Sequence, residues 1–220
     1  MRCSHACHLN AIHLQVQKLR SMKSNIVKIV LAAVIVLLTY LIYESINQPI
    51  RFLKEKKIRD TEVVQNLKDI RNVQALYKAE KGHYTGSFDS LLEYIKVGEI
   101  PVVNVIPDPT DTTFTKTIKD TLGYVKVIDT LFKHHKSFNV NELPIIPFSN
   151  GVKFEMAAGE IDRGGVKVSV FEVKAPFSVY LKGLDIQRIN NLIASEEAIE
   201  KFAGLKVGSL EEPSTDGNWE

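Results

Sequence analysis

The feature that most constrains this chain is an apolar segment near its N-terminus. Residues 26–43 carry one charge, on Lys28, and residues 29–43 carry none. In a helix, these eighteen residues rise about 27 Å, close to the ~30 Å hydrocarbon core of a bilayer. Because residues 31–38 are apolar on every face, they lack the polar stripe of a helix at the edge of a soluble core. The sequence therefore predicts a membrane-spanning helix.

Residues at both ends of the segment suit a membrane anchor, which we place at residues 23–46. Lys28 can extend its ammonium to the interface, and Tyr40 and Tyr43 lie at the far end, where amphipathic rings are favoured. Neither a small-residue cleavage site nor a cysteine that could accept lipid follows, so we expect an uncleaved anchor. The residues assigned to the anchor are Lys28, Leu31, Ile35, Leu38, Tyr40 and Tyr43.

The first residues of the chain hold both of its cysteines and three of its six histidines. Cys3, His5, Cys7 and His8 have the residue types of a zinc site but not the two separated pairs that zinc sites use. We interpret residues 1–22 as a disordered leader, or as sequence upstream of a true start at Met22. Basic residues flank both sides of the anchor, and we expect the C-terminal domain on the periplasmic side of the inner membrane.

The rest of the chain has the composition of one water-facing domain, which we place at residues 50–210, with a loose polar tail at 211–220. The whole sequence has 28 basic and 26 acidic residues, which argues against binding to nucleic acid. After an expected break or kink at Pro49, apolar residues recur at steps of three and four between Ile58 and Tyr77. They predict a long amphipathic helix that ends at Gly82.

Local patterns predict the remaining elements. A short helix is expected at 88–96, a loop at 101–120 and a strand at 123–130. Alternating residues at 152–156 and 166–170, with two glycines between them, predict a hairpin. A further strand is expected at 178–182 and a helix at 185–202. The predicted fold class is α+β, in which a transmembrane helix continues into an amphipathic helix packed on a small, mainly antiparallel sheet.

Residues 71–92 end a tyrosine-bearing helix, continue through Gly82-His-Tyr-Thr85, and include Phe88-Asp89 and the paired leucines 91 and 92. This stretch resembles type IV pilins and type II secretion pseudopilins. The chain departs from that family before the apolar segment, because residues 23–26 contain no glycine for a prepilin peptidase. The candidates for contact with neighbouring subunits are Glu44, just past the anchor, and Tyr77, Tyr84 and Phe88.

The blocks 165–172, 180–184 and 205–212 are similar to an uncharacterised family of single-pass envelope proteins of Gram-negative bacteria. That resemblance implies a membrane-anchored envelope protein and no assigned activity. It is consistent with the absence of G-x-S-x-G, Walker, H-E-x-x-H and G-x-G-x-x-G motifs from the sequence.

Loose polar residues offer weaker candidates for chemistry. His134 and His135 are adjacent and diverge on either a strand or a helix, so we expect a solvated loop. Three carboxylates could supply oxygen ligands to calcium, but they lack the compact spacing of calcium-binding loops. They are Asp108, Asp111 and Asp120. Trp219 lies in the polar tail, where we expect fraying. No enzyme activity, metal or cofactor is predicted.

These patterns predict a single-pass, membrane-anchored structural or interaction protein of the bacterial envelope, pilin-like or part of a secretion assembly. Its expected partners are the lipid bilayer and either envelope proteins or further copies of the chain, with no nucleic acid. The alternative is a membrane-tethered module that binds or senses a ligand.

Overall fold

The computed structural model describes the backbone of residues 4–107, 117–131 and 139–220. Side chains are described for residues 27–104, 121–131 and 139–220. The chain divides into two units, Met1–Lys54 and Glu55–Glu220. The helices are α1 (Ser4–Lys81), α2 (Phe88–Val97), α3 (Val127–Leu131), α4 (Phe177–Tyr180) and α5 (Ile186–Glu197). The strands are β1 (Glu99–Pro107), β2 (Thr117–Lys126), β3 (Glu155–Arg163), β4 (Val166–Pro176) and β5 (Gly204–Gly208). A short 3₁₀ turn spans Val140–Glu142.

The described residues of the first unit form one continuous helix, although a disordered leader and a break or kink at Pro49 were expected. The predicted disordered leader at 1–22 is helical from Ser4 onward, and residues 4–22 contain neither glycine nor proline to stop a helix. The helix also runs through Pro49 without the expected interruption. Proline removes one backbone donor, but the turns on either side keep their own hydrogen bonds.

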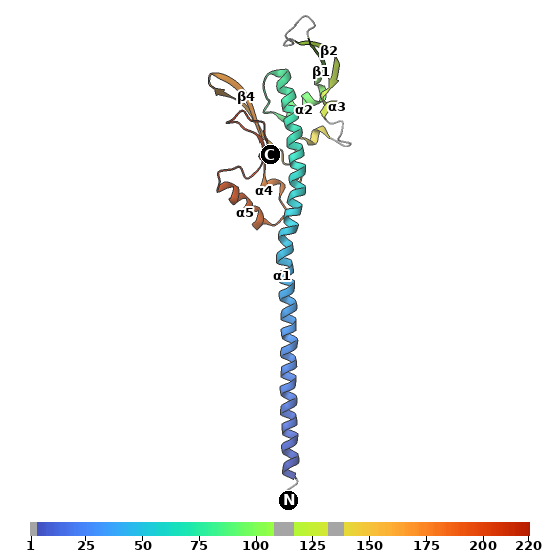
Figure 1. The fold of residues 1–220 in the computed structure, drawn as a ribbon, viewed down its shortest axis with the longest axis vertical. Helices are drawn as coiled ribbons and strands as arrows, with labels where there is room; N and C mark the ends of the chain where they lie inside the picture. The colour runs from blue at the N-terminus through green and yellow to red at the C-terminus, as the bar shows by residue number, and fades with distance from the viewer. Residues whose placement is uncertain (1–3, 108–116, 132–138) are drawn as a thin grey trace. The chain divides into compact units, whose positions relative to one another are not determined.

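In the second unit, one face of α1 is buried. Val63, Leu67, Ile70 and Val73 are completely inaccessible to solvent and follow the three- and four-residue steps of a single helix face. Figure 1 shows α2 and the sheet that contains β4 beside this C-terminal part of α1. The helix ends at Lys81 as predicted, because Gly82 adopts φ +83° and donates its N–H to the carbonyl of Lys78 at 2.8 Å.

The predicted hairpin is present in a three-stranded antiparallel sheet of order β3-β4-β5. Arg163 pairs with Val166, and the two residues between them, Gly164 and Gly165, have φ +65° and +83°. Positive φ at both central positions is the requirement of a type I′ turn, which matches the twist of the strands. The hairpin extends to residue 176, further than the sequence pattern indicated.

A second sheet contradicts the expected loop at 101–120. Strands β1 and β2 pair antiparallel from Glu99↔Lys126 to Pro107↔Thr117. Proline in β1 suggested irregular structure, but a strand with an outer edge tolerates residues that cannot donate a hydrogen bond. The expected strand at 123–130 ends at Lys126, and α3 begins at the next residue. The fold is therefore α+β, with two small antiparallel sheets in place of one.

The segment predicted as a strand at 178–182 instead begins within the helical turn α4. Its Tyr180 is fully buried and donates its hydroxyl to Asp60 Oδ1 at 2.7 Å. Arg59 Nη1 donates to the carbonyls of Tyr180 and Lys182 at 2.9 and 3.0 Å. These contacts with α1 satisfy the carbonyls of a turn that has no partner strand. The predicted helix at 185–202 is present but shorter, as α5.

The C-terminal residues are packed, so the expectation of a loose tail is wrong. Gly208 N–H donates to the carbonyl of Asp216 at 3.0 Å, and Asn218 donates to the carbonyl of Gly204 at 2.9 Å. Glu220 forms an ion pair with Arg71 of α1 at 2.9 Å. The side chains of the tail are polar, but its backbone pairs with β5.

Gln74 ties α1 to the turn that follows it. Its side chain is fully buried, and its Nε2 donates to the carbonyl of Thr85 at 2.6 Å. The N–H of Thr85 donates to Gln74 Oε1 at 3.2 Å, so one amide satisfies both backbone groups of a buried residue. Buried backbone groups are costly when they lack a partner.

We expect Gln74→Leu to destabilise the domain by about 1–3 kcal/mol, because it leaves both polar groups of Thr85 buried and unpaired. Chemical unfolding of the full chain in a non-ionic detergent measures this change. Gln187→Leu makes the same replacement at an exposed site on α5 and should change stability by less than about 0.5 kcal/mol. Equal stability of the two variants would contradict this role of Gln74.

Candidate functional site

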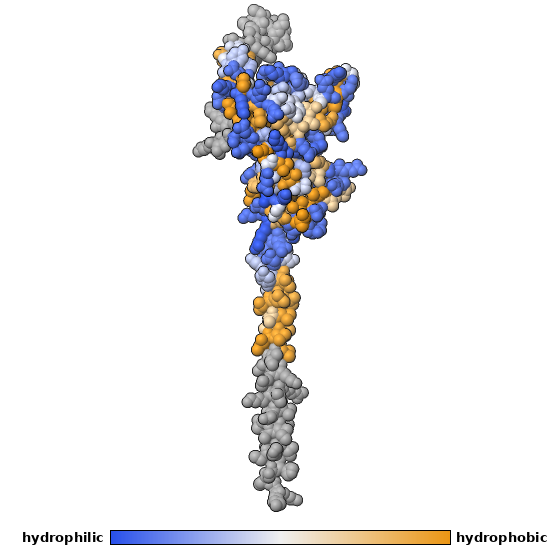
Figure 2. Space-filling view, turned by 180° about the vertical axis from the view of Figure 1, so that it is seen from behind, coloured by the Kyte–Doolittle hydropathy of each residue, from blue (hydrophilic) through white to orange (hydrophobic). Residues whose placement is uncertain are grey.

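Residues 29–43 of α1, in the first unit, present apolar side chains on all sides of the helix. Every residue from Val27 to Tyr43 is exposed, and Figure 2 shows hydrophobic residues over the visible face of this part of the helix. All six residues assigned to the anchor are exposed, Leu38 by 52% and Leu31 by 59%. Among the described residues, α1 is the one helix long and apolar enough to cross a membrane, and none of its apolar window is buried. The helix is compatible with a single transmembrane or signal-anchor segment.

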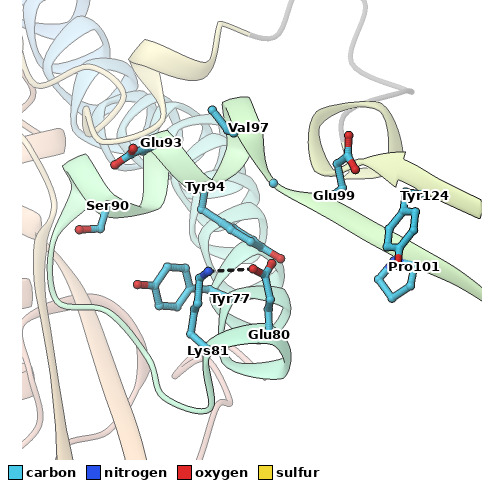
Figure 3. Close-up of a pocket in the computed structure, with 11 residues that line it drawn as sticks. Tyr77, Glu80, Lys81, Ser90, Glu93, Tyr94, Val97, Glu99, Pro101 and Tyr124 are labelled. Carbon is cyan, nitrogen blue, oxygen red and sulfur yellow. Dashed lines mark ion pairs between the residues drawn. The ribbon is translucent and has the colours of Figure 1, made fainter.

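In the second unit, a pocket of about 740 Å³ lies where α1 ends and α2 passes into β1. Figure 3 shows the side chains that line it. The last turns of α1 contribute Tyr77, Glu80 and Lys81, and α2 contributes Glu93 and Tyr94. Binding sites for small ligands have volumes of roughly 300–1,000 Å³, so the pocket has the size of such a site.

Two tyrosines form the aromatic wall of the pocket. The rings of Tyr77 and Tyr94 are 5.3 Å apart at 82°, the edge-to-face arrangement that aromatic pairs favour. Tyr94 is 8% exposed, whereas Tyr124, which reaches the pocket from β2, is 68% exposed. Packing therefore holds Tyr94 in place, whereas Tyr124 is exposed to solvent.

The charge of the pocket is mainly negative. Glu80 Oε1 is 2.8 Å from Lys81 Nζ, and Glu93 and Glu99 also line the pocket. The Glu80 carboxylate raises the pKa of Lys81 by accepting a hydrogen bond from its ammonium. Burial raises the pKa of Tyr94 to about 12, and the charge of Glu80 and a hydrogen bond to it add to the shift. The Tyr94 hydroxyl therefore stays protonated well above neutral pH.

A second hollow, of about 580 Å³, lies between α1 and the loop at 145–151. Phe148, Asn150 and Gly151 of this loop have positive φ, and the Arg59 guanidinium lies 5.0 Å from the Phe148 ring centre. Ser149 donates its hydroxyl to the carbonyl of Val152 at 3.0 Å, which stabilises the turn. Nowhere among the described residues do three or more His, Cys, Asp or Glu side chains gather in a way that would hold a metal ion.

The four candidate contact residues lie in different surroundings. Tyr77 lines the pocket, whereas the Tyr84 ring packs against Phe171 of β4 with centres 4.6 Å apart. Phe88 begins α2 and is half-buried. Glu44 belongs to the first unit, where it accepts a hydrogen bond from Gln48 at 3.5 Å. Of the four, Tyr77 is the one that the structure brings to a candidate site in the second unit.

No pattern in the sequence singled out Glu80 and Tyr94, which line the pocket together with Tyr77. Trp219 is half-buried in the packed tail, which differs from the expected fraying. Several earlier candidates lie outside the residues whose side chains the structure describes, namely Cys3, His5, Cys7, His8, Asp108, Asp111, Asp120, His134 and His135.

Comparisons with protein-family models, with curated proteins and with solved structures find no match to this chain. The candidate sites are therefore defined by the geometry of the chain itself. They are the exposed apolar part of α1 and the pocket at its C-terminal end.

The pKa of Tyr94 predicts a specific loss of stability at high pH. An unfolded tyrosine has a pKa near 10, so the raised pKa stabilises the fold fully below about pH 10. That contribution is lost as the pH rises toward 12, so the melting temperature of the wild type should fall more steeply than that of Tyr94→Phe. Circular dichroism melting between pH 9 and 12 measures both.

Tyr124→Phe is the matched control, because it removes the hydroxyl of an exposed tyrosine beside the same pocket. Its melting temperature should follow the wild type through this pH range. Parallel curves for wild type and Tyr94→Phe would show that Tyr94 does not ionise differently in the folded and unfolded chains.

Proposed function

We propose that this chain is a single-pass inner-membrane protein whose residues 23–46 span the bilayer and whose C-terminal domain binds other envelope proteins or further copies of itself. The observation that carries the proposal is the exposure of every residue from Val27 to Tyr43 in a helix that has no charge after Lys28. Transfer of each large aliphatic side chain out of water is favourable by on the order of 1.5–3 kcal/mol. A bilayer provides that transfer on all sides of the helix at once.

The distribution of these side chains favours lipid over a protein partner. A helix that packs in a soluble assembly needs one apolar stripe and keeps a polar face toward water. Residues 29–43 have no charged residue on any face, and Thr39 satisfies its hydroxyl by donating to the carbonyl of Ile35 at 2.8 Å. That bond within the helix is the kind that a polar group needs in hydrocarbon.

The resemblance to pilins and pseudopilins supports an interaction role for the domain. In residues 71–92, Gly82 ends the helix, and Gln74 and Phe171 hold Thr85 and Tyr84 of the following turn. In this proposal the helix anchors the chain and the domain meets its neighbours in the periplasm. The amphipathic part of α1 connects the two.

We expect Val34→Arg with Ile35→Arg to release the chain from membranes. Each arginine at the centre of a spanning helix costs roughly 2.5–3.5 kcal/mol of insertion free energy. Flotation of cell membranes in a density gradient should recover most of the wild type and little of the double variant.

The control exchanges the same two residues, as Val34→Ile with Ile35→Val, and keeps the volume and hydrophobicity of the segment. It should float like the wild type. A double-arginine variant that still floats with the membranes would contradict the assignment of residues 23–46 as the anchor.

Orientation has its own test. We expect alkaline phosphatase fused after Glu220 to be active, because that enzyme folds only outside the cytoplasm, and a fluorescent protein at the same site to be dark. Phosphatase silence together with bright fluorescence would reverse the proposed topology and leave the membrane anchor intact.

The pocket favours a second candidate, a membrane-tethered module that binds or senses a ligand. Its size and its convergent polar groups are those of a ligand site. Chemical crosslinking in native membranes distinguishes the two candidates. An interaction protein should give crosslinked species larger than one chain, and a sensor module should remain a single chain.

A further inference from the structure

The walls of the pocket have the chemistry of a cation site. The face of a tyrosine ring carries partial negative charge and attracts a cation placed within about 6 Å of its centre. Tyr77 and Tyr94 present such rings nearly at right angles, with their centres 5.3 Å apart. Tyr124 adds a third, exposed ring from β2. The lining of the pocket therefore includes aromatic rings from α1, α2 and β2.

The charged residues of the pocket favour a ligand of positive charge. Glu80, Glu93 and Glu99 supply three carboxylates against the one ammonium of Lys81, a formal excess of two negative charges. An anion would be repelled. The carboxylates are also not gathered as metal ligands, since no group of three suitable side chains holds a metal position among the described residues. These features favour an organic cation over an anion or a metal ion.

The chain already holds one cation in this pocket. Lys81 Nζ lies 2.8 Å from Glu80 Oε1, and Figure 3 shows this pair beside the Tyr77 and Tyr94 side chains. Both residues of the pair are about half exposed, and Lys81 is the last residue of α1. Its flexible side chain can therefore swing into solvent and leave Glu80 to another cation.

We propose that this pocket binds an organic cation, an alkylammonium or guanidinium group, with Glu80 as its counter-ion and the rings of Tyr77 and Tyr94 as its walls. Val97 and Pro101 offer apolar surface for the alkyl part of the ligand. Lys81 occupies the cation position when the ligand is absent and competes with it. The inference goes beyond the proposed membrane function and does not depend on it.

Calorimetric titration of the full chain in a non-ionic detergent tests the proposal directly. The first probe is butylammonium chloride, which reproduces the ammonium and four-carbon stem of lysine. 1-Butanol is its neutral counterpart, and sodium chloride at equal concentration controls for ionic strength. Of the three solutes, we expect only butylammonium to bind saturably. Equal binding of butylammonium and 1-butanol would overturn the proposal.

The two residues of the ion pair should act in opposite directions. Glu80→Gln removes the counter-ion and should weaken butylammonium binding at least threefold. Lys81→Met removes the competing ammonium and should tighten binding about two- to fivefold, the range of an exposed ion pair. A merely structural pair would shift affinity in the same direction, or not at all, when either residue is replaced, and such a result would overturn the proposal.

Two controls separate this effect from folding and from general charge. Lys167→Met removes one positive charge from β4, outside the pocket, and should leave the affinity unchanged. Equal tightening by Lys167→Met and Lys81→Met would overturn competition at the site. The melting temperature of Glu80→Gln should stay close to that of the wild type, because Glu80 is exposed.

A further pair of probes identifies where the cation comes from. Nα-acetyl-lysine amide presents the ammonium as a peptide does, and butylammonium presents it on a free amine. Tighter binding of the lysine derivative indicates a lysine side chain of a partner, and tighter binding of butylammonium indicates a small amine. The same lysine derivative acetylated at Nε has no positive charge and should not bind. Binding of this neutral compound would contradict recognition of the charge.

Discussion

The domain depends on one row of buried side chains along α1. Val63, Leu67, Ile70 and Val73 are wholly removed from solvent, and no other helix in the described residues offers a comparable surface. An isolated two-stranded hairpin is marginally stable in water, and small sheets gain stability by packing against a helix. Here α1 contacts the three-stranded sheet, where Gln74 donates to Met156 of β3 and Lys78 donates to the carbonyl of Ser169 of β4, and α2 contacts β2 of the other sheet. The same helix, earlier in the chain, carries the exposed apolar segment.

Parts of this fold could be predicted from the sequence because local and tertiary preferences agree there. The hairpin of β3 and β4 has alternating residues and two glycines at the turn, and α1 ends at a glycine that takes positive φ. Prediction failed where a tertiary contact decides. Tyr180 lies in a stretch whose sequence resembles a strand. However, its hydroxyl donates a hydrogen bond to Asp60, and its carbonyl accepts one from Arg59. These two contacts with α1 stabilise a helical turn instead. The prolines and threonines at 101–120 favoured a loop in the sequence-based prediction, so the pairing of β1 with β2 was not predicted.

The two candidate sites differ in how far the sequence reveals them. An uncharged stretch is visible in the sequence, and the exposed side chains of residues 27–43 agree with the anchor assigned to it. The pocket is formed by residues from α1, α2 and β2 that no spacing connects. Tyr77 was a candidate because it belongs to the stretch at 71–92 that resembles pilins and pseudopilins. In the sequence, Glu80 and Tyr94 are ordinary residues of two predicted helices, and only the fold brings them to one pocket.

Cysteine accessibility along the apolar segment tests the membrane anchor most directly. Cys3 and Cys7 are replaced by serine, single cysteines are placed at each position from 27 to 50, and the variants are treated in native membranes with a charged maleimide. A lipid-embedded helix predicts a continuous block of unreactive positions over about residues 29–43, with reactivity returning beyond Tyr43. Reactivity that rises and falls every three to four residues would indicate a helix with one face in water, and would contradict a membrane-spanning anchor.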